Sequence, residues 1–293
     1  MLIKPDCIPC VLRMSVTAMR ALKLDETRMR SLYRRIAELP GLRGEDWNVV
    51  SPALIEGVMK IIMKAADSPD PFSLLKWKQN KRVLEVEPHI RSLIHEDADP
   101  LFGAIKLAIL GNRIDLMVSE NPTDFLDWIK AQLQVPVSRQ AYADFKERLG
   151  RSELLVYLGD NSGEIVFDKL LIEILRAQYP LEVIFVVRSI PTMNDVTLTE
   201  AEDAGITVVA QVVENGIMGP FPGTSLKRCS GELRDLLERA DIIVSKGGGN
   251  FDSLGEETAS VTEKTTFMLL SKCLPYCNLF GTGLFDPVLF HIP

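Results

Sequence analysis

The apolar residues of this 293-residue chain change their spacing near Gly150, and this change limits the possible folds more than any other feature. Before Gly150 they recur at intervals of three and four, which is typical of amphipathic helices. After Gly150 they gather in short unbroken runs separated by helical stretches. Unbroken apolar runs between helices are typical of buried strands in a parallel sheet. The sequence therefore predicts a helical region over residues 1–150 and an α/β domain over residues 151–293.

The first half predicts helices and no strand. Met29, Leu32, Ile36 and Leu39 form an apolar stripe behind Asp25, whose carboxylate is suited to cap the start of that helix. Pro-Gly, Asp-Pro and Asn-Pro pairs interrupt the pattern, as expected of turns. Further helices are expected over 72–80, 88–96, 101–110, 123–133 and 138–149.

The second half predicts strands alternating with helices. Strands are expected over 154–158, 183–187, 206–209, 242–244 and 277–280. Helices are expected over about 164–178, from about 195, near 230–239 and near 257–271. Such alternation favours a Rossmann-like parallel sheet with helices on both faces, here preceded by an all-helical N-terminal region.

Polar residues follow the first two of these strands where each ends. Asp160, Asn161 and Glu164 belong to a Gly-Asp-Asn-Ser-Gly-Glu segment after the first strand, and Asp195 follows the second. Ligands of open α/β sheets bind outside the carboxyl ends of the strands. Carboxylate and amide oxygens are ligands that Mg²⁺ and Mn²⁺ prefer. We therefore predict a divalent-metal site of two carboxylates and an amide oxygen at this edge of the sheet, the alternative being that Asp160 and Asp195 only cap the helices that follow them.

A glycine-rich segment follows the strand at 242–244 and predicts a phosphate-binding loop. Lys246 is followed by Gly247, Gly248, Gly249 and Asn250. Glycines let backbone N–H groups approach an anion closely, and the lysine adds a positive charge. An ordinary glycine-rich turn is the alternative. The spacing matches neither dinucleotide-binding loops nor P-loops, so a nicotinamide dehydrogenase or a P-loop NTPase fits poorly.

Composition and charge narrow the class of protein. The chain has 40 acidic and 33 basic residues and a formal net charge of −7, which argues against a nucleic-acid partner held by a basic face. No apolar stretch reaches the roughly 18 residues of a membrane helix, and the start has no signal-peptide pattern. Five cysteines are an odd count that does not fit a disulfide framework. We expect a cytoplasmic protein without a nucleic-acid or membrane partner, and these patterns do not indicate its oligomeric state.

Several short motifs, taken together and in order, resemble those of a known family. The Asp-Asn-Ser-Gly-Glu segment at 160–164, the Arg-Ser-Ile-Pro-Thr-Met-Asn-Asp segment at 188–195 and the Lys-Gly-Gly-Gly-Asn segment at 246–250 are similar to motifs of the damage-control phosphatases, also called domain of unknown function 89. Further motifs resemble its prokaryotic, cysteine-containing branch: Cys-Ile-Pro-Cys at 7–10, Asp-Pro-Phe at 70–72, Gly-Asn-Arg-Ile-Asp at 111–115 and Lys-Cys at 272–273. The resemblance spans nearly the whole chain. One departure is Gly249, which stands where relatives often have a bulkier residue.

The resemblance implies a metal-dependent phosphatase that hydrolyses sugar phosphates and related, often damaged, metabolites. It implies one divalent ion, which we expect to be Mn²⁺, Mg²⁺, Co²⁺ or Ni²⁺, on Asp160, Asn161 and Asp195. Asp160, Asp195 and Glu164 are the expected catalytic residues, and either an aspartate or a metal-bound water is the attacking group. The alternative for Glu164 is that it only favours the dipole of the helix it starts.

The substrate phosphate is expected to contact residues 246–250 and Asn112. Asn112 and Asp115, in the helical half, could close the cleft from its other side. A polar helix terminus is an equally good interpretation of these two residues.

Cys7 and Cys10 form half of a zinc-binding pattern, which Cys273 or Cys277 could extend. The resemblance favours Cys7, Cys10 and Cys273 as a second metal site, and small apolar cysteines in a core are the alternative.

Two other classes of function are alternatives to the phosphatase. One is a transferase similar to carboxyl methyltransferases, and the other is a non-enzymatic regulator that binds metal or sugar phosphate. The chain shows no glycine-rich cofactor loop for the first and no partner surface for the second. We therefore favour the phosphatase.

Overall fold

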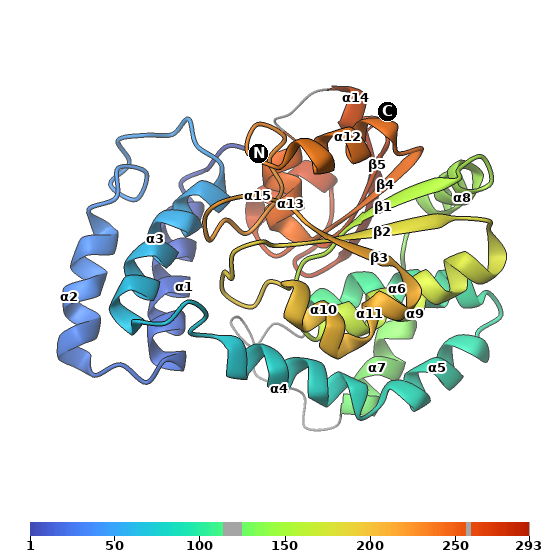
Figure 1. Cartoon of the computed structure of the whole chain (residues 1–293), viewed down its shortest axis with the longest axis horizontal. Coiled ribbons are helices and arrows are strands. Elements are labelled where there is room, and N and C mark those ends of the chain that lie inside the picture. Colours follow the sequence, from blue (N-terminus) through green and yellow to red (C-terminus); the bar gives the residue numbers. More distant parts are fainter. Residues whose placement is uncertain (114–124, 256–258, 293) are drawn as a thin grey trace.

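A computed structural model describes residues 1–113, 125–255 and 259–292, and its centre is a six-stranded sheet with the order β3-β2-β1-β4-β5-β6 (Figure 1). The strands are β1 (Leu154–Leu158), β2 (Glu182–Val187), β3 (Gln211–Glu214), β4 (Ile242–Lys246), β5 (Thr265–Leu270) and β6 (Pro287–His291). Neighbouring strands pair in parallel except β5 and β6, which pair antiparallel. The predicted fold class, a mostly parallel sheet flanked by helices and preceded by a helical region, is confirmed.

Helices fill the chain before the sheet and most of the connections within it. The first eight are α1 (Cys7–Ala21), α2 (Glu26–Ala37), α3 (Ser51–Ala66), α4 (Ser73–Leu84), α5 (Glu87–His95), α6 (Pro100–Leu110), α7 (Phe125–Leu133) and α8 (Arg139–Leu149), with the 3₁₀ turn η1 (Gly111–Arg113) after α6. The later ones are α9 (Glu164–Gln178), α10 (Leu198–Ala204), α11 (Ile206–Val209), α12 (Gly231–Arg239), α13 (Gly247–Leu254), α14 (Ala259–Thr262) and α15 (Leu274–Phe280). Asp25 caps α2 as predicted, because its side chain accepts a hydrogen bond from the Arg28 N–H.

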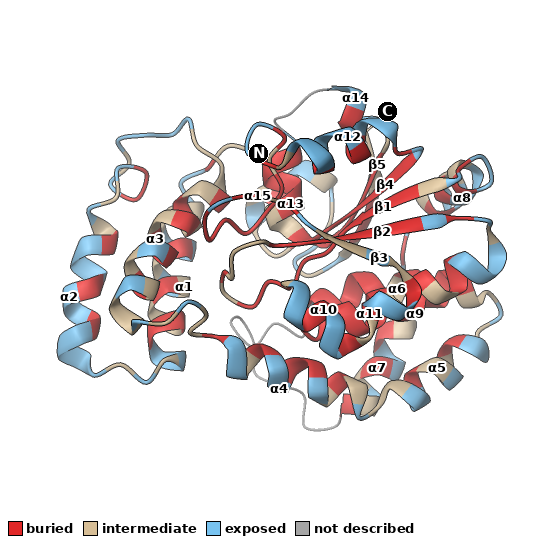
Figure 2. Cartoon of the chain, in the orientation of Figure 1, coloured by how far each residue is buried: buried red, intermediate tan, exposed pale blue. Residues whose placement is uncertain are grey.

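Side chains of each strand alternate between the two faces of the sheet, and each face has its own core. Leu155 and Tyr157 of β1 belong to the core that includes α6 and α9. Val156 and Leu158 belong to the opposite core, which includes α12 and α13. Because helices cover both faces, the central strands are buried along their length (Figure 2), and this explains why their apolar runs are unbroken.

The helices of the first half contribute to two different cores. α1, α2 and α3 form a bundle at one end of the molecule with a separate core (Figure 1), whereas α5 to α8 contribute to the core that also contains α9. The boundary predicted near residue 150 lies between α8 and β1 and stays a prediction about domain organisation. Within the described ranges, no helix is long and apolar enough to span a bilayer.

The strand predicted over residues 206–209 is wrong, because these residues form the helical turn α11 and β3 follows it. Gly205 ends α10 with φ 79°, in the left-handed region, and α11 begins at the next residue. The helical turn buries Ile206 and Val209, which are three positions apart, and leaves Val208 82% exposed. A four-residue apolar run therefore fits a helical turn as well as a strand.

Two further predictions near the C-terminal end are wrong. The helix expected over 257–271 is, in its described part, α14 followed by β5, whose Thr-Thr-Phe-Met-Leu-Leu sequence suits a central strand. The strand expected over 277–280 is instead the end of α15, which has Pro275 in its first turn. The antiparallel edge strand β6 was not predicted.

Candidate active site

The predicted polar segments lie together at the carboxyl edge of the sheet. Asn161, just after β1, forms a β-bridge with Asp195 in the loop after β2, and the Val196 N–H donates to the Asp160 carbonyl at 2.9 Å. β4, which ends at Lys246, lies between β1 and β5 in the sheet. The register of the parallel strands therefore places the three segments side by side.

Three carboxylates lie in one buried cluster, those of Asp160, Asp195 and Glu164, and these residues are only 7%, 3% and 1% exposed. Asn112 donates from Nδ2 to Asp160 Oδ2 at 3.0 Å and to Glu164 Oε2 at 2.6 Å. Asn161 donates from Nδ2 to the same two oxygens, at 2.7 and 3.4 Å. The two amide groups therefore fix the orientation of Asp160 and Glu164. The structure thus brings Asn112, from the helical half, to the predicted site.

Arg188, which had no predicted role, connects the two aspartates. Its guanidinium is buried, and Nε donates to Asp195 Oδ2 at 2.7 Å, while Nη2 lies 3.6 Å from Asp160 Oδ1. Nη1 donates to Asn250 Oδ1 at 3.2 Å. The signal that could have identified it is its position directly after β2, at the same edge of the sheet as the aspartates.

The negative charge of the carboxylate cluster is only partly balanced by nearby positive side chains. Burial raises the pKa of Asp160 well above its ordinary value, the nearby Asp195 and Glu164 carboxylates raise it further, and Arg188 opposes them. A bound cation would offset this repulsion. The donor set is made of hard oxygens, which suits Mg²⁺ or Mn²⁺. The residues present therefore fit a divalent ion on Asp160, Asn161 and Asp195.

Lys246 is buried beneath these carboxylates, and its ammonium is directed at protein oxygens. Nζ donates to Glu164 Oε1 at 2.5 Å, to Asp168 Oδ1 at 2.6 Å and to the Ala108 carbonyl at 2.8 Å. Burial lowers the pKa of Lys246, but the Asp168 and Glu164 carboxylates outweigh it and raise the pKa above its ordinary value. Lys246 thus forms ion pairs with Glu164 and Asp168, and the phosphate contact predicted for it stays a prediction. Asp168 had no predicted role.

The glycines after Lys246 form the first turn of α13, which lies against Asp160. Gly247 has φ 73°, and a Cβ there would lie 1.9 Å from Asp160 Oδ2. A Cβ on Gly249 would lie 2.0 Å from the Pro222 carbonyl oxygen. Asn250 donates to the Gly159 carbonyl at 3.1 Å and thereby ties α13 to the end of β1. These close approaches explain the run of glycines.

The other predicted residues lie away from this cluster. Within the residues that the structure describes, no group of three or more His, Cys, Asp or Glu side chains is arranged to hold a metal ion; the set Asp160, Asn161 and Asp195 contains two of these side chains and an amide. The metal site predicted on Cys7, Cys10 and Cys273 stays a prediction. Burial raises the pKa of the Cys273 thiol to about 11, which keeps it protonated at neutral pH. Asp115 lies outside the described residues.

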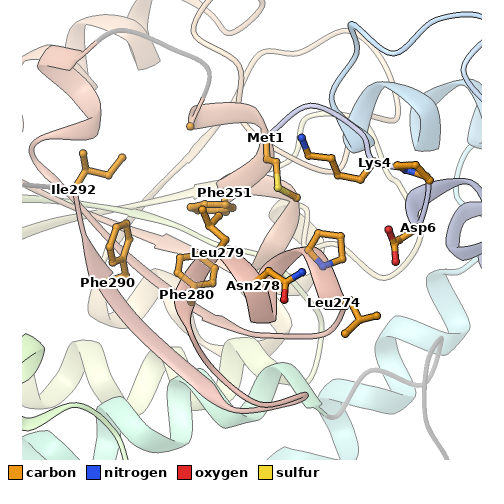
Figure 3. Close-up of a pocket in the computed structure, with 13 residues that line it drawn as sticks. Met1, Lys4, Asp6, Phe251, Leu274, Asn278, Leu279, Phe280, Phe290 and Ile292 are labelled. Carbon is orange, nitrogen blue, oxygen red and sulfur yellow. The ribbon is translucent and has the colours of Figure 1, made fainter.

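A pocket of about 840 Å³ lies at the other end of α13 (Figure 3). Its walls are mostly apolar and include Phe251 of α13, Phe280 of α15, Phe290 of β6 and Met1. Its lining contains none of the predicted site residues. The candidate active site is instead closed around its own carboxylates, as their low exposure shows.

Known proteins of one family are similar to this chain in sequence and in structure. Residues 3–288 match the model of the damage-control phosphatase ARMT1-like domain. An uncharacterised protein of Methanocaldococcus jannaschii is 30% identical over 295 residues, which cover 98% of this chain and 94% of that protein. A damage-control phosphatase of Pyrococcus horikoshii is 28% identical over 275 residues, 93% of this chain and 92% of that protein. The crystal structure of a DUF89 family protein from Pyrococcus horikoshii matches with a TM-score of 0.85 and 25% identity over 99% of each chain.

Proposed function

This chain belongs to the damage-control phosphatase family, and from that membership we propose that it is a divalent-metal-dependent phosphomonoesterase. The named relatives support a phosphatase of damaged metabolites. The metal dependence and the substrates, small phosphate monoesters such as sugar phosphates, are our proposal. The observation that carries it is the buried oxygen cluster of Asp160, Asn161 and Asp195 at the carboxyl edge of the sheet.

The proposed metal ligands are one oxygen from each of Asp160, Asn161 and Asp195. A divalent ion bound there would neutralise charge on the phosphoryl oxygens as the P–O bond breaks. Arg188 holds the aspartates in place through its contacts with both side chains. The first turn of α13 adds backbone N–H groups and the positive end of a helix dipole next to Asp160, and both favour a phosphate at that position.

Glu164 is the proposed general base. Asn112 and Asn161 donate to its Oε2 and Lys246 donates to its Oε1, so the carboxylate has one orientation beside Asp160. An oriented carboxylate can accept a proton from an attacking water molecule. Asn112 contacts both Asp160 and Glu164 and would keep these two groups at a fixed separation.

The test is hydrolysis of p-nitrophenyl phosphate and a panel of sugar phosphates by protein freed of metal with a chelator. Activity should return on addition of Mn²⁺, Mg²⁺, Co²⁺ or Ni²⁺. Asp160→Ala should lower kcat at least about a hundredfold, because it removes a group that stabilises charge in the transition state. Asp235→Ala, at an exposed position on α12, is the matched control and should retain full activity.

Three results would contradict the proposal. One is phosphate release that persists after chelation, and another is an Asp160→Ala variant that retains full activity. The third is tight binding of phosphate esters without turnover across the whole panel, which would favour a regulator.

A further inference from the structure

We propose that Lys246 is a positioning residue that holds the Glu164 carboxylate in place, and that it does not bind the substrate phosphate. Asp168 and the Ala108 carbonyl also accept hydrogen bonds from its ammonium group. The inference rests on the proposed function, because it assigns a part in the same site.

The hydrogen bonds of Lys246 account for its whole donor capacity. An ammonium group has three N–H bonds, and Lys246 Nζ has three acceptors, Glu164 Oε1, Asp168 Oδ1 and the Ala108 carbonyl oxygen, at 2.5, 2.6 and 2.8 Å. The side chain is 0% exposed. A phosphate oxygen could be bound by Lys246 only if one of these three bonds broke.

Breaking the bond to Asp168 or Glu164 would be costly. Both carboxylates are 1% exposed, and a buried carboxylate without a cationic partner is strongly destabilised. Burial raises the pKa of Asp168 to about 6 even though Lys246 and the Tyr157 hydroxyl oppose this rise. The Tyr157 hydroxyl donates to the same Asp168 oxygen at 2.6 Å, so Asp168 is fixed from two sides.

Glu164 connects Lys246 to the candidate active site through its two carboxylate oxygens. One of its oxygens accepts from Lys246, and the other accepts from the side-chain amides of Asn112 and Asn161. Lys246 comes from β4, while Glu164 and Asp168 lie one turn apart on α9. The lysine thus ties α9 to β4 directly beneath the proposed metal ligands.

A double-mutant cycle tests whether Lys246 acts by positioning Glu164. The variants are Glu164→Gln, Lys246→Met and the combination, assayed for kcat and KM with p-nitrophenyl phosphate at saturating Mg²⁺ and for inhibition by inorganic phosphate. Lys246→Met should lower kcat about tenfold or more, while KM and the phosphate inhibition constant change by less than about twofold. In the Glu164→Gln background, the same substitution should lower kcat by less than about threefold, because its target is already lost.

Two results would overturn the inference while leaving the phosphatase intact. One is a rise in KM or in the phosphate inhibition constant of about tenfold with Lys246→Met, as expected of a phosphate ligand. The other is a full multiplicative loss in the double variant. If Lys246→Met alone does not fold, the cycle is repeated with Asp168→Asn in every variant, which removes the other buried carboxylate that Lys246 neutralises.

Lys76→Met is the matched control for the loss of a buried lysine. Lys76 is also 0% exposed and also bridges two carboxylates, Asp70 at 2.6 Å and Glu200 at 2.9 Å. Its removal should lower the midpoint of thermal unfolding to a similar extent. A loss of kcat equal to that of Lys246→Met would show that the effect is merely structural and would refute the positioning role.

A readout that does not depend on catalysis separates this inference from the proposed function. In protein labelled with ¹⁵N-lysine, the Nζ signal that is absent in Lys246→Met identifies Lys246. This signal should shift in Glu164→Gln and in Asp168→Asn, and it should stay in place when Mg²⁺ and phosphate are added. The positioning role would be refuted if the signal did not shift in either variant. It would also be refuted if phosphate shifted the signal as much as the substitutions do. If the wild-type protein hydrolysed no phosphate ester, only the proposed phosphatase activity would be refuted.

Discussion

Gly247 is the residue whose lack of a side chain matters most directly to the candidate site. A Cβ at this position would lie 1.9 Å from Asp160 Oδ2, and the backbone has φ 73°. Gly247→Ala should therefore displace the Asp160 carboxylate and lower metal-dependent kcat at least about tenfold, with a loss of about 1–3 kcal/mol in unfolding free energy from backbone strain. Steady-state kinetics and urea unfolding measure the two effects.

Gly281→Ala separates strain from contact with the carboxylate. Gly281 has φ 65°, but a Cβ there would meet no heavy atom within 4 Å. Its substitution should lower stability by a similar amount and leave kcat unchanged. Equal kcat values for the two alanine variants would show that the contact between Gly247 and Asp160 does not limit activity.

At the scale of elements, Asn80 joins α4 to the start of α9. Its Oδ1 accepts from the Gly163 N–H at 2.6 Å, and both residues are buried. Asn80→Ala should cost about 1–3 kcal/mol in urea unfolding, because it leaves a buried N–H without its partner. Activity should fall as well, since α9 carries Glu164. Asn278→Ala, at an exposed position of α15, is the control, and equal stabilities of the two variants would rule out this anchoring role.

At the scale of the whole molecule, His291 connects α8 to the edge of the sheet. Its Nδ1 lies 2.9 Å from the Thr266 hydroxyl and its Nε2 lies 3.1 Å from the Ala141 carbonyl. Burial lowers the pKa of His291 below its ordinary value of about 6.5. The unfolded chain therefore binds the proton more tightly, and this contribution to stability, present above about pH 6.5, is lost as the pH falls toward the folded pKa.

His291→Gln should therefore lose less unfolding free energy than the wild type between about pH 7.5 and about pH 5.5. The comparison with wild type is needed because Asp168 titrates in the same range with the opposite sign. Its raised pKa, about 6, makes its contribution largest at low pH and reduces it as the pH rises. Equal losses in the two proteins would contradict the role of His291.

The positions of β1, β2 and β4, and of the polar residues after them, were predictable because they follow from local patterns. Each strand has an unbroken apolar run, and the end of the strand is marked by a glycine or a charged residue. The pattern failed at α11, β5 and α15, where short apolar runs fit a helix and a strand equally well. In these segments the neighbouring elements decide the conformation, and no local signal reports them.

The sequence by itself determined where Asp160, Asn161 and Asp195 stand along the chain and that they meet at one edge of a sheet. Only the tertiary structure decided which cation meets which carboxylate. Lys246 reaches Ala108, which is 138 positions away in the chain, and Arg188, directly after β2, reaches Asp160 after the neighbouring strand β1 as well as Asp195 in its own loop. The sequence predicted a phosphate contact for Lys246, and the structure pairs its ammonium with Glu164 and Asp168. The physical reason is that ion pairing depends on distance in space and on burial, and neither can be read from spacing along the chain.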